Sequence, residues 1–170
     1  MSDLHHRLVG AALPALTLPA TDGTRVDLSA LPGRTILYIY PRTSPPDGTS
    51  IPGWSEIPGA KGCTPQSCGF RDHFRELTAA GAKAVYGLSV QDTAYQAEAA
   101  KRLHLPFPLL SDADGELRAA LNLPVFAAAG MTLLVRMAMV LCDGTIEHIF
   151  HPIDDPARNA EDVLEYLRAA

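Results

Sequence analysis

The chain has 170 residues, of which 47% are hydrophobic and 19% charged, and these values predict one globular domain over residues 1–170. A formal net charge of −5 without any cluster of Lys or Arg argues against nucleic acid as a partner, because phosphate binding needs a basic face. Three cysteines are too few for a disulfide scaffold, and no apolar run reaches the roughly 18 residues that a membrane helix needs.

The N-terminal residues Leu8–Ala20 have the apolar character of a signal-peptide core. Pro14 and Pro19 interrupt this stretch, however, and Arg7 is the only firm positive charge that precedes it. We therefore interpret the stretch as the N-terminus of the mature chain and expect the protein to be cytoplasmic.

Several segments of the N-terminal half have strand patterns. Asp22-Gly23 is a turn dipeptide between two apolar runs, so we expect an N-terminal β-hairpin formed by Leu16–Leu18 and Arg25–Leu28. The β-branched and aromatic residues of Arg34–Tyr40 and Lys83–Val90 are typical of central strands.

A long loop and an amphipathic helix are expected between these two strands. Pro and Gly make up 9 of the 22 residues at 41–62, a composition that indicates a rigid loop, and loops of this length inside a domain are usually functional. The helix after it, which should end at Gly81, is indicated by apolar residues at helical spacing: Phe70, Phe74 and Leu77. Thr64 is a suitable N-cap and Pro65 fits only the first turn, which places Cys63 just before the helix.

The C-terminal half continues the alternation of helices and strands. Thr93 and Gln96 form a capping-box pattern, and Glu98 faces Arg102 one turn later. The expected elements are helix Asp92–His104, extended residues Pro106–Leu110, helix Gly115–Leu121, strand Met131–Leu141, strand Thr145–Phe150 and a last helix capped by Asn159. This order predicts an α/β domain of three layers with a mixed sheet.

The chemistry of the sequence concentrates at Cys63. A thiol at the start of a helix faces unpaired N–H groups and the positive end of the helix dipole, which favours the nucleophilic thiolate. Position alone does not distinguish such a nucleophile from a cysteine that packs as a small apolar residue.

Cys68 follows five residues later. In an ideal helix the two Cα atoms would lie roughly 8 Å apart, whereas a disulfide needs about 7 Å or less. The two thiols can therefore pair only if the first turn of the helix melts, which suits a redox switch. The spacing is also compatible with two unrelated cysteines.

The segment from Gly62 to Asp72, Gly-Cys-Thr-Pro-Gln-Ser-Cys-Gly-Phe-Arg-Asp, resembles the active-site segment of the peroxiredoxin Q, or bacterioferritin-comigratory, branch of the peroxiredoxins. The resemblance extends over nearly the whole chain. Further similar motifs are Leu16–Pro19 with Asp22-Gly23, Val26–Ser29, Leu37–Pro41, Leu110–Gly115 and Asp143–His148. Several separate motifs in the same order are much more specific than any one of them.

The resemblance implies a thioredoxin-like fold and a thiol peroxidase without a cofactor or metal. Cys63 matches the peroxidatic cysteine, which a peroxide oxidises to a sulfenic acid, and Cys68 matches the resolving cysteine, which would form an intrachain disulfide with it. The implied partners are hydrogen peroxide or an organic hydroperoxide and a thioredoxin- or glutaredoxin-type reductant. We expect a monomer or a weak homodimer.

Arg136 is the only charged residue between Met131 and Leu141. A guanidinium in so apolar a strand must have a partner or reach water, and the strand pattern alone leaves open an exposed structural role. The resemblance implies that Arg136 is the family's catalytic arginine, whose fixed charge would lower the pKa of the thiol and stabilise the reacting oxygens.

One position departs from the family pattern. The family has a threonine three residues before the reactive cysteine, whereas this chain has Ala60. A hydroxyl from the long loop could replace it, and the sequence does not choose among the candidates: Thr43, Ser44, Thr49, Ser50 and Ser55. The departure leaves open a different peroxide preference or weak peroxidase activity.

Other candidate residues receive structural interpretations. Cys142 lies outside the motif and is expected to pack. A zinc site made by Cys63, Cys68 and His73 is disfavoured because their spacing spreads them around the helix axis and no fourth ligand is evident. Trp54 is expected to anchor the long loop or to line a pocket. His5 and His6 are expected to be disordered at the surface. The other histidines lack any cluster of candidate ligands: His104, His148 and His151.

Two alternative functions remain at this stage. The first is a thiol–disulfide oxidoreductase on the same fold, which is disfavoured because that chemistry usually uses Cys-x-x-Cys and here four residues intervene. The second is a non-enzymatic redox sensor, in which Ala60 has removed efficient turnover.

Overall fold

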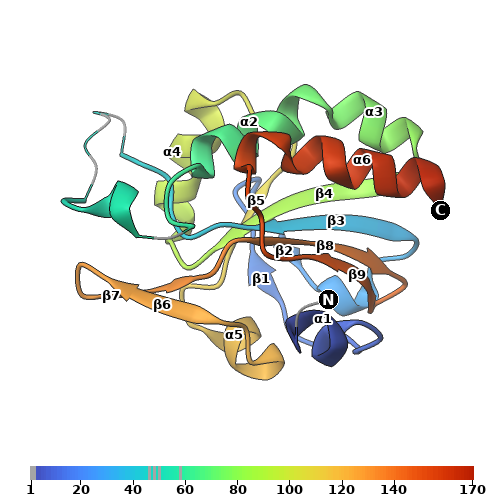
Figure 1. Cartoon of the computed structure of the whole chain (residues 1–170). Coiled ribbons are helices and arrows are strands. Elements are labelled where there is room, and N and C mark those ends of the chain that lie inside the picture. The colour runs from blue at the N-terminus through green and yellow to red at the C-terminus, as the bar shows by residue number, and fades with distance from the viewer. Residues whose placement is uncertain (1–2, 46, 48, 50, 58) are drawn as a thin grey trace.

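A five-stranded mixed sheet forms the centre of the molecule (Figure 1). The computed structural model describes residues 3–45, 47, 49, 51–57 and 59–170. In the strand order β5-β4-β3-β8-β9 the first three strands run parallel to one another, and β8 and β9 are antiparallel to their neighbours. The strands are β3 (Arg34–Ile39), β4 (Ala82–Ser89), β5 (Leu109–Ser111), β8 (Met137–Cys142) and β9 (Thr145–Phe150).

Helices cover both faces of this sheet, so the predicted three-layer α/β fold with a mixed sheet is confirmed (Figure 1). On the upper side lie α2 (Cys63–Asp72), α3 (Phe74–Ala79), α4 (Thr93–Arg102) and α6 (Asn159–Ala169), the last preceded by the 3₁₀ turn η3 (Pro156–Arg158). On the lower side lie α1 (Asp3–Leu8), the 3₁₀ turn η1 (Leu28–Ala30) and α5 (Glu116–Leu121).

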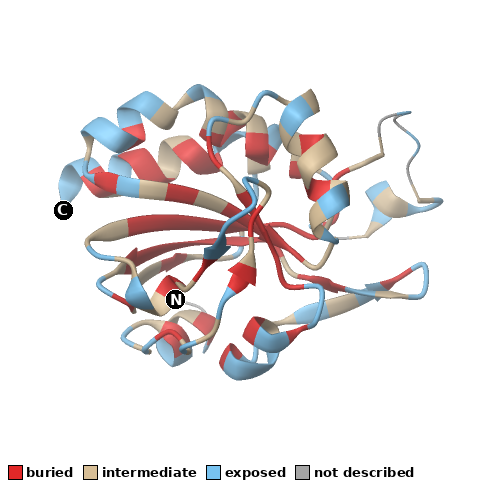
Figure 2. Cartoon of the chain, turned by 180° about the vertical axis from the view of Figure 1, so that it is seen from behind, coloured by how far each residue is buried: buried red, intermediate tan, exposed pale blue. Residues whose placement is uncertain are grey.

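The central strands β3 and β8 are buried on both faces because nearly all of their residues are apolar. Alternate residues of β3 point to opposite sides, so Ile36 and Tyr38 pack toward α2 and α6, while Leu37 and Ile39 pack toward α1 and α5. Figure 2 shows the strands as an almost continuous buried layer between the two sets of helices. Cys63 belongs to the apolar cluster on the α2–α6 side.

The N-terminal part of the chain differs from the expectation. The predicted hairpin is present, although its strands are only β1 (Leu18–Pro19) and β2 (Arg25–Val26). The prediction that His5 and His6 are disordered is wrong, because both lie in α1. This helix buries Leu4 and Leu8 and is tied to the end of α5 by Arg7, whose guanidinium donates to the carbonyl oxygens of Leu121 and Asn122 at 2.7 Å each.

Besides the start of α2, which is described with the active site, three predicted helix boundaries are wrong. The helix that was expected to run to Gly81 is interrupted at His73, which separates α2 from α3. Asp92, not Thr93, caps α4, because its carboxylate accepts a hydrogen bond from the Tyr95 amide at 2.8 Å. Asn159 is the first residue of α6 and is buried, so its side chain is not a solvent-facing cap.

The predicted strand Met131–Leu141 is two strands. β7 (Met131–Leu134) pairs with β6 (Val125–Ala128) in a separate hairpin, and β8 begins at Met137 in the central sheet. The apolar run hides this break because both pieces consist mainly of apolar residues. Arg136 therefore lies in the link between two sheets and not within a strand.

Among the described residues of the 41–62 loop, Trp54–Glu56 form the 3₁₀ turn η2. The loop and the β6–β7 hairpin project from the same side of the molecule in both cartoon views (Figures 1 and 2). The rings of Trp54 and Phe126 lie 6.3 Å apart, so Trp54 holds the loop against this hairpin. This contact agrees with the expected anchoring role of Trp54.

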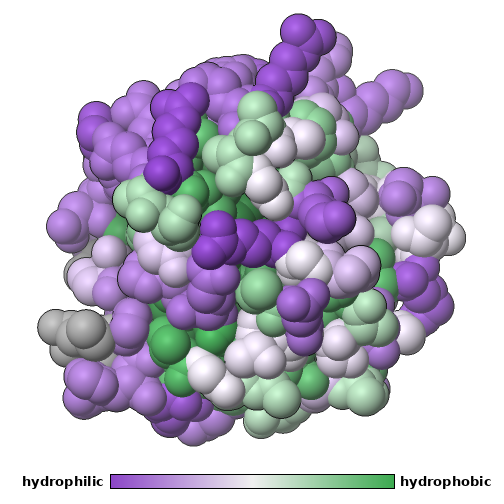
Figure 3. Space-filling model, turned by 90° about the vertical axis from the view of Figure 1, so that its right-hand side faces the viewer, coloured by the Kyte–Doolittle hydropathy of each residue, from purple (hydrophilic) through white to green (hydrophobic). Residues whose placement is uncertain are grey.

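The surface opposite the loop is mainly polar. Figure 3 shows hydrophilic residues over most of this face, with smaller apolar patches between them. Among the described residues, Val125 is the only large hydrophobic side chain that is exposed. None of the helices in the described ranges is long and apolar enough to cross a bilayer.

Glu147 on β9 should contribute pH-dependent stability. Burial raises the pKa of its carboxyl, but hydrogen bonds from Tyr166 at 2.6 Å and from Arg34 at 3.0 and 3.1 Å outweigh burial and hold the pKa below its usual range. A lowered folded-state pKa gives stability that is present above the unfolded pKa of about 4.3 and is lost as the pH falls through the folded value.

We therefore expect Glu147→Gln to lower the free energy of unfolding by about 1 kcal/mol at pH 7, since the pair is partly exposed. The difference from the parent should disappear toward pH 3. Urea denaturation at both pH values measures it, and an equal difference at pH 3 and pH 7 would contradict the assigned charge interaction.

Candidate active site

Cys63 is the first residue of α2, two positions further into the helix than the sequence indicated. Gly62, not Thr64, is the N-cap, with φ 110° and ψ 10°. A Cβ atom at this position would lie only 2.6 Å from Cγ of Pro156, so Gly62 is required both by its backbone conformation and by the close approach of η3. The thiol thus lies in the first turn, where backbone N–H groups have no helical partner and the helix dipole is positive.

The structure brings Arg136 to Cys63. Both residues are buried, with exposed fractions of 3% and 4%. Nη2 of Arg136 lies 3.2 Å from Sγ of Cys63, within reach of a charge-assisted hydrogen bond. Arg136 is therefore not on an exposed strand face, and its cationic group faces the atom that the sequence identified as the nucleophile.

Four further acceptors hold the guanidinium in place. Nη2 also donates to the carbonyl oxygens of Gly59, Ala60 and Lys61 at 3.3, 2.9 and 3.1 Å. Nη1 donates to Oε1 of Gln66 at 2.6 Å, and Nε2 of Gln66 donates to Oδ1 of Asn159 at 3.0 Å. These neutral acceptors pair with Nη1 and Nη2, while the buried Nε has no hydrogen-bond partner among the described residues. Because none of the acceptors neutralises the cation, its positive charge remains available to the thiolate.

The hydroxyl that the family pattern expects before Cys63 has no replacement among the described residues. Ala60 is fully buried, and the bonds of Cys63 Sγ are to Arg136 and, at 3.7 Å, to the Ala60 carbonyl. Thr43 and Thr49 direct their hydroxyls to Gln91 and Asp47. Ser44 and Ser55 make no hydrogen bond to the thiol, and Ser50 lies outside the described residues.

Two tyrosines pack beneath the reactive segment. The ring of Tyr38 stacks on Phe70 at 4.6 Å and its hydroxyl bonds to Ser67 at 3.0 Å, while Tyr40 lies next to it at 5.8 Å. Burial raises the pKa of both phenols, so both stay neutral. These rings fix the apolar face of α2 against β3 and leave Arg136 as the cation that contacts Cys63.

Cys68 lies in the second turn of the same helix. All three cysteines are free thiols, and α2 is continuous from Cys63 through Cys68. A continuous helix separates their Cα atoms by roughly 8 Å, too far for a disulfide. The structure therefore shows the reduced arrangement, in which the two thiols are separate.

A cavity opens beside Arg136. Its volume is about 460 Å³, and it is lined by Arg136, Gly59, His151 and Asp154 together with apolar side chains of the 41–62 loop, β6, the β7–β8 link and the segment after β9: Ile57, Phe126, Val135, Pro152 and Ile153. The lining therefore carries one guanidinium and one carboxylate, and most of the rest is apolar. Such a cavity fits a small molecule with one polar and one apolar end.

The remaining sequence candidates lie away from this centre. Cys142 ends β8, and its sulfur lies 3.8 Å from a carboxylate oxygen of Asp143, which together with burial raises the pKa of the thiol. The ring of His148 lies 5.3 Å from that of His5, which in turn is 6.3 Å from His6. Within the described ranges no group of His, Cys, Asp and Glu is arranged to hold a metal ion.

Sequence reasoning missed Gln66 and Asn159. The role of Gln66 could have been predicted, because it lies three residues after Cys63 and so on the same side of the helix. The role of Asn159 could not, since only the folded structure places its helix against α2.

Comparisons with known proteins agree with this geometry. The family model described as Redoxin matches residues 8–164. The protein named "Peroxiredoxin Q, chloroplastic" of Oryza sativa subsp. japonica is 33% identical over 162 residues. These residues cover 94% of this chain but only 66% of the rice protein, so the chain spans slightly less than two thirds of that relative's length.

Two solved structures are also similar. Peroxidoxin BcpB from Mycobacterium tuberculosis is 27% identical with a TM-score of 0.76, and the match covers 96% of this chain and 98% of that one. The bacterioferritin comigratory protein of Xanthomonas campestris, whose structures were described for its alkyl peroxide reduction activity, is 26% identical with a TM-score of 0.72 and covers 94% and 98%. The thioredoxin-like topology expected from the sequence is thereby confirmed.

Proposed function

Because the chain belongs to the Redoxin family and within it to the peroxiredoxin Q branch, we propose that it is a thiol-dependent peroxidase whose nucleophile is Cys63. The Cys63 thiolate attacks the terminal oxygen of a hydroperoxide and the O–O bond breaks. The other oxygen leaves with the bonding electrons and, after taking a proton, departs as an alcohol or water. Cys63 is thereby oxidised to a sulfenic acid.

The observation that carries this proposal is the contact between Nη2 of Arg136 and Sγ of Cys63. A fixed cation at 3.2 Å stabilises the thiolate and then the negative charge that develops on the reacting oxygens. The loop carbonyls and Gln66 hold this cation in position before the substrate arrives, so little reorganisation is needed during the reaction.

Cys68 is proposed to close the catalytic cycle. Its thiol attacks the Cys63 sulfenic acid, an S–S bond forms and water leaves. A dithiol reductant of the thioredoxin or glutaredoxin type then reduces this disulfide by two electrons and is itself oxidised to a disulfide. From the sequence alone we also propose that the protein is a monomer or a weak homodimer and that it is cytoplasmic.

Organic hydroperoxides are proposed as substrates alongside hydrogen peroxide. The Xanthomonas relative is described for alkyl peroxide reduction, and the cavity beside Arg136 is walled largely by apolar side chains. An alkyl group can occupy this cavity while the peroxide oxygens face the guanidinium.

A coupled assay tests the proposed function. Purified protein is mixed with thioredoxin, thioredoxin reductase and NADPH, and NADPH consumption is followed with hydrogen peroxide, cumene hydroperoxide or a disulfide substrate. Peroxide-dependent consumption supports the peroxidase. Consumption that depends only on the disulfide substrate would identify an oxidoreductase, and oxidation of Cys63 without turnover would identify a redox sensor.

Arg136→Ala should slow the reaction of Cys63 with peroxide by about 100-fold, the usual effect of removing one preorganised charge-stabilising donor. The variant should also raise the pH at which Cys63 becomes alkylated, because the thiolate loses its cation. Stopped-flow oxidation and a pH series of iodoacetamide alkylation measure these two effects.

Arg118→Ala, on α5, is the matched control for loss of an arginine. A normal oxidation rate in folded Arg136→Ala would show that the contact with Sγ is only structural.

A further inference from the structure

A chain of buried side chains links the C-terminal helix to the reactive thiol. Asn159, the first residue of α6, is 1% exposed and accepts a hydrogen bond from Gln66, which is fully buried. Gln66 in turn accepts from Nη1 of Arg136, whose Nη2 contacts Cys63. We refer to Asn159, Gln66 and Arg136 as the amide relay.

The donor and acceptor types of the relay permit one arrangement. A guanidinium has only donors, so Gln66 must turn its carbonyl oxygen toward Arg136 and its NH₂ group toward Asn159. Asn159 must then present its own carbonyl oxygen. If this acceptor were missing, the NH₂ group of Gln66 would be buried without a partner, which is costly enough to favour rotation of the amide away from Arg136.

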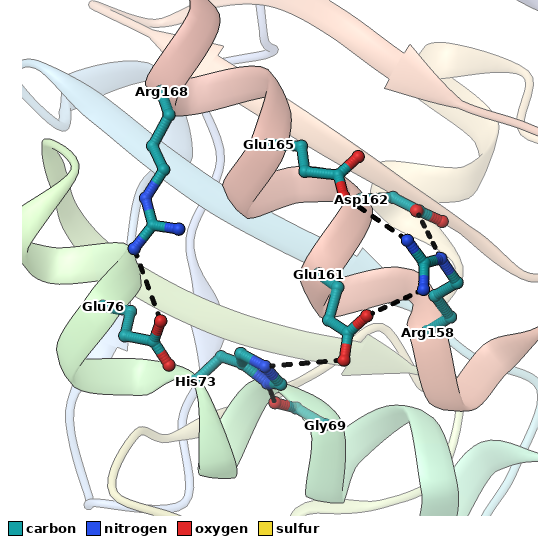
Figure 4. Close-up of polar contacts among 8 residues, drawn as sticks. All are labelled: Gly69, His73, Glu76, Arg158, Glu161, Asp162, Glu165 and Arg168. Atoms are coloured by element: carbon teal, nitrogen blue, oxygen red, sulfur yellow. Dashed lines mark hydrogen bonds and ion pairs between the residues drawn. The ribbon is translucent and has the colours of Figure 1, made fainter.

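Close packing against α2 holds the start of α6, and with it Oδ1 of Asn159, in a fixed position. A Cβ atom on Gly69 would lie 3.2 Å from the carbonyl oxygen of Ala157 and 3.6 Å from Cβ of Ala160, so α2 and the start of α6 are in close contact. On the surface, His73 lies between the Gly69 carbonyl at 2.9 Å and the Glu161 carboxylate at 3.8 Å (Figure 4). The buried relay and this surface link therefore connect the same two helices independently.

We propose that Asn159 is a positioning residue of the active site, which acts through Gln66 to keep Arg136 against Cys63. The C-terminal helix then determines how tightly the guanidinium is held, although it does not touch the thiol. The proposal deepens the proposed function, but its main measurement is the reactivity of Cys63 toward iodoacetamide, which needs no peroxide turnover.

The test compares three variants of the full chain. Asn159→Leu keeps the volume but removes the acceptor, Asn159→Asp keeps the acceptor, and Glu161→Gln weakens the surface link between the same helices without touching the relay. Alkylation of the Cys63 peptide is followed by mass spectrometry across a pH series, and thermal unfolding is recorded for each variant. Stopped-flow oxidation by hydrogen peroxide is measured in parallel.

Asn159→Leu should move the alkylation profile of Cys63 to higher pH and slow its oxidation about 3- to 10-fold, as for coupled members of one hydrogen-bond network. Asn159→Asp should restore most of the parental profile, and Glu161→Gln should leave it unchanged even if it lowers the melting temperature. If Asn159→Leu does not fold, Gln66→Met breaks the relay from the α2 side and should give the same shift.

Three results would overturn the proposal. The first is a parental alkylation profile of Cys63 in folded Asn159→Leu or Gln66→Met. The second is an Asn159→Asp variant whose alkylation profile stays as altered as that of Asn159→Leu. The third is a Glu161→Gln variant whose alkylation profile changes as much as that of Asn159→Leu. If the alkylation profile shifts as expected but the parent shows no peroxide turnover, the relay stands and the proposed peroxidase function fails.

Discussion

Cys63→Ser is expected to abolish peroxide-dependent NADPH consumption. The reaction needs a sulfur nucleophile, and both the start of α2 and the guanidinium of Arg136 direct positive charge toward Sγ of Cys63. A serine hydroxyl ionises far less readily and does not form the sulfenic acid on which the cycle depends. No other group of the described site has both the burial and the cationic contact of Cys63.

Cys142→Ser is the matched control for loss of a thiol. Its sulfur lies beside the Asp143 carboxylate, and burial together with this carboxylate raises the pKa of the thiol, so Cys142 is a poor nucleophile. We expect nearly parental turnover in this variant. Substantial peroxide turnover by folded Cys63→Ser, or a large loss in Cys142→Ser, would show that the nucleophile has been assigned to the wrong cysteine.

The central layers of the fold could be predicted because their signals are local. Arg34–Ile39 and Ala82–Ser89 consist mainly of apolar residues, and they form central strands within a residue or two of the expected bounds. The break at Arg136 could not be predicted in this way. A continuous apolar run does not reveal that its two halves pair with different partners, β6 and β3.

The active site, too, could be predicted only where a local sequence pattern or the family resemblance indicated a residue. Cys63 was recognised from its place at a helix start and Arg136 from the family resemblance, and the structure brings them into contact. Asn159 could not be found, because 93 residues separate it from Gln66 in sequence and an asparagine near a helix start is ordinarily a cap. The Asn159 amide has its role only because the fold places Gln66 against it.

Cys68→Ser is expected to leave the oxidation of Cys63 by peroxide intact but to block the disulfide formation that follows it. The first oxidation of Cys63 should keep its parental rate, because the Cys68 thiol makes no contact with Arg136 or with Cys63 in the reduced helix. Steady-state turnover should fall to near zero with thioredoxin, because no intrachain disulfide forms. Stopped-flow oxidation and the coupled assay on one preparation measure both. Unchanged turnover in this variant would exclude Cys68 as the resolving thiol.

The same step predicts a change of structure in the parent protein. The helix must open at its first turns to bring the two sulfur atoms together, and each backbone hydrogen bond that is lost costs about 0.5–1.5 kcal/mol. Opening also removes Gln66 from Arg136 and Asn159, since Gln66 lies between the two cysteines. From Gly69 onward, contact with Ala157 and Ala160 and the buried ring of Phe70 should keep the helix in place.

Amide hydrogen exchange should therefore rise on oxidation in residues 63–70 and change little beyond Leu77, and mass spectrometry should find Cys63 joined to Cys68 within one chain. Asn159 provides the internal check, because the amides at the start of α6 should exchange faster once Gln66 has left its side chain. An intermolecular disulfide, a bond between Cys63 and Cys142, or unchanged exchange across residues 63–70 would each contradict this mechanism. Faster exchange at residues 63–70 with no change at Asn159 would instead show that α6 holds its buried amide without the help of α2.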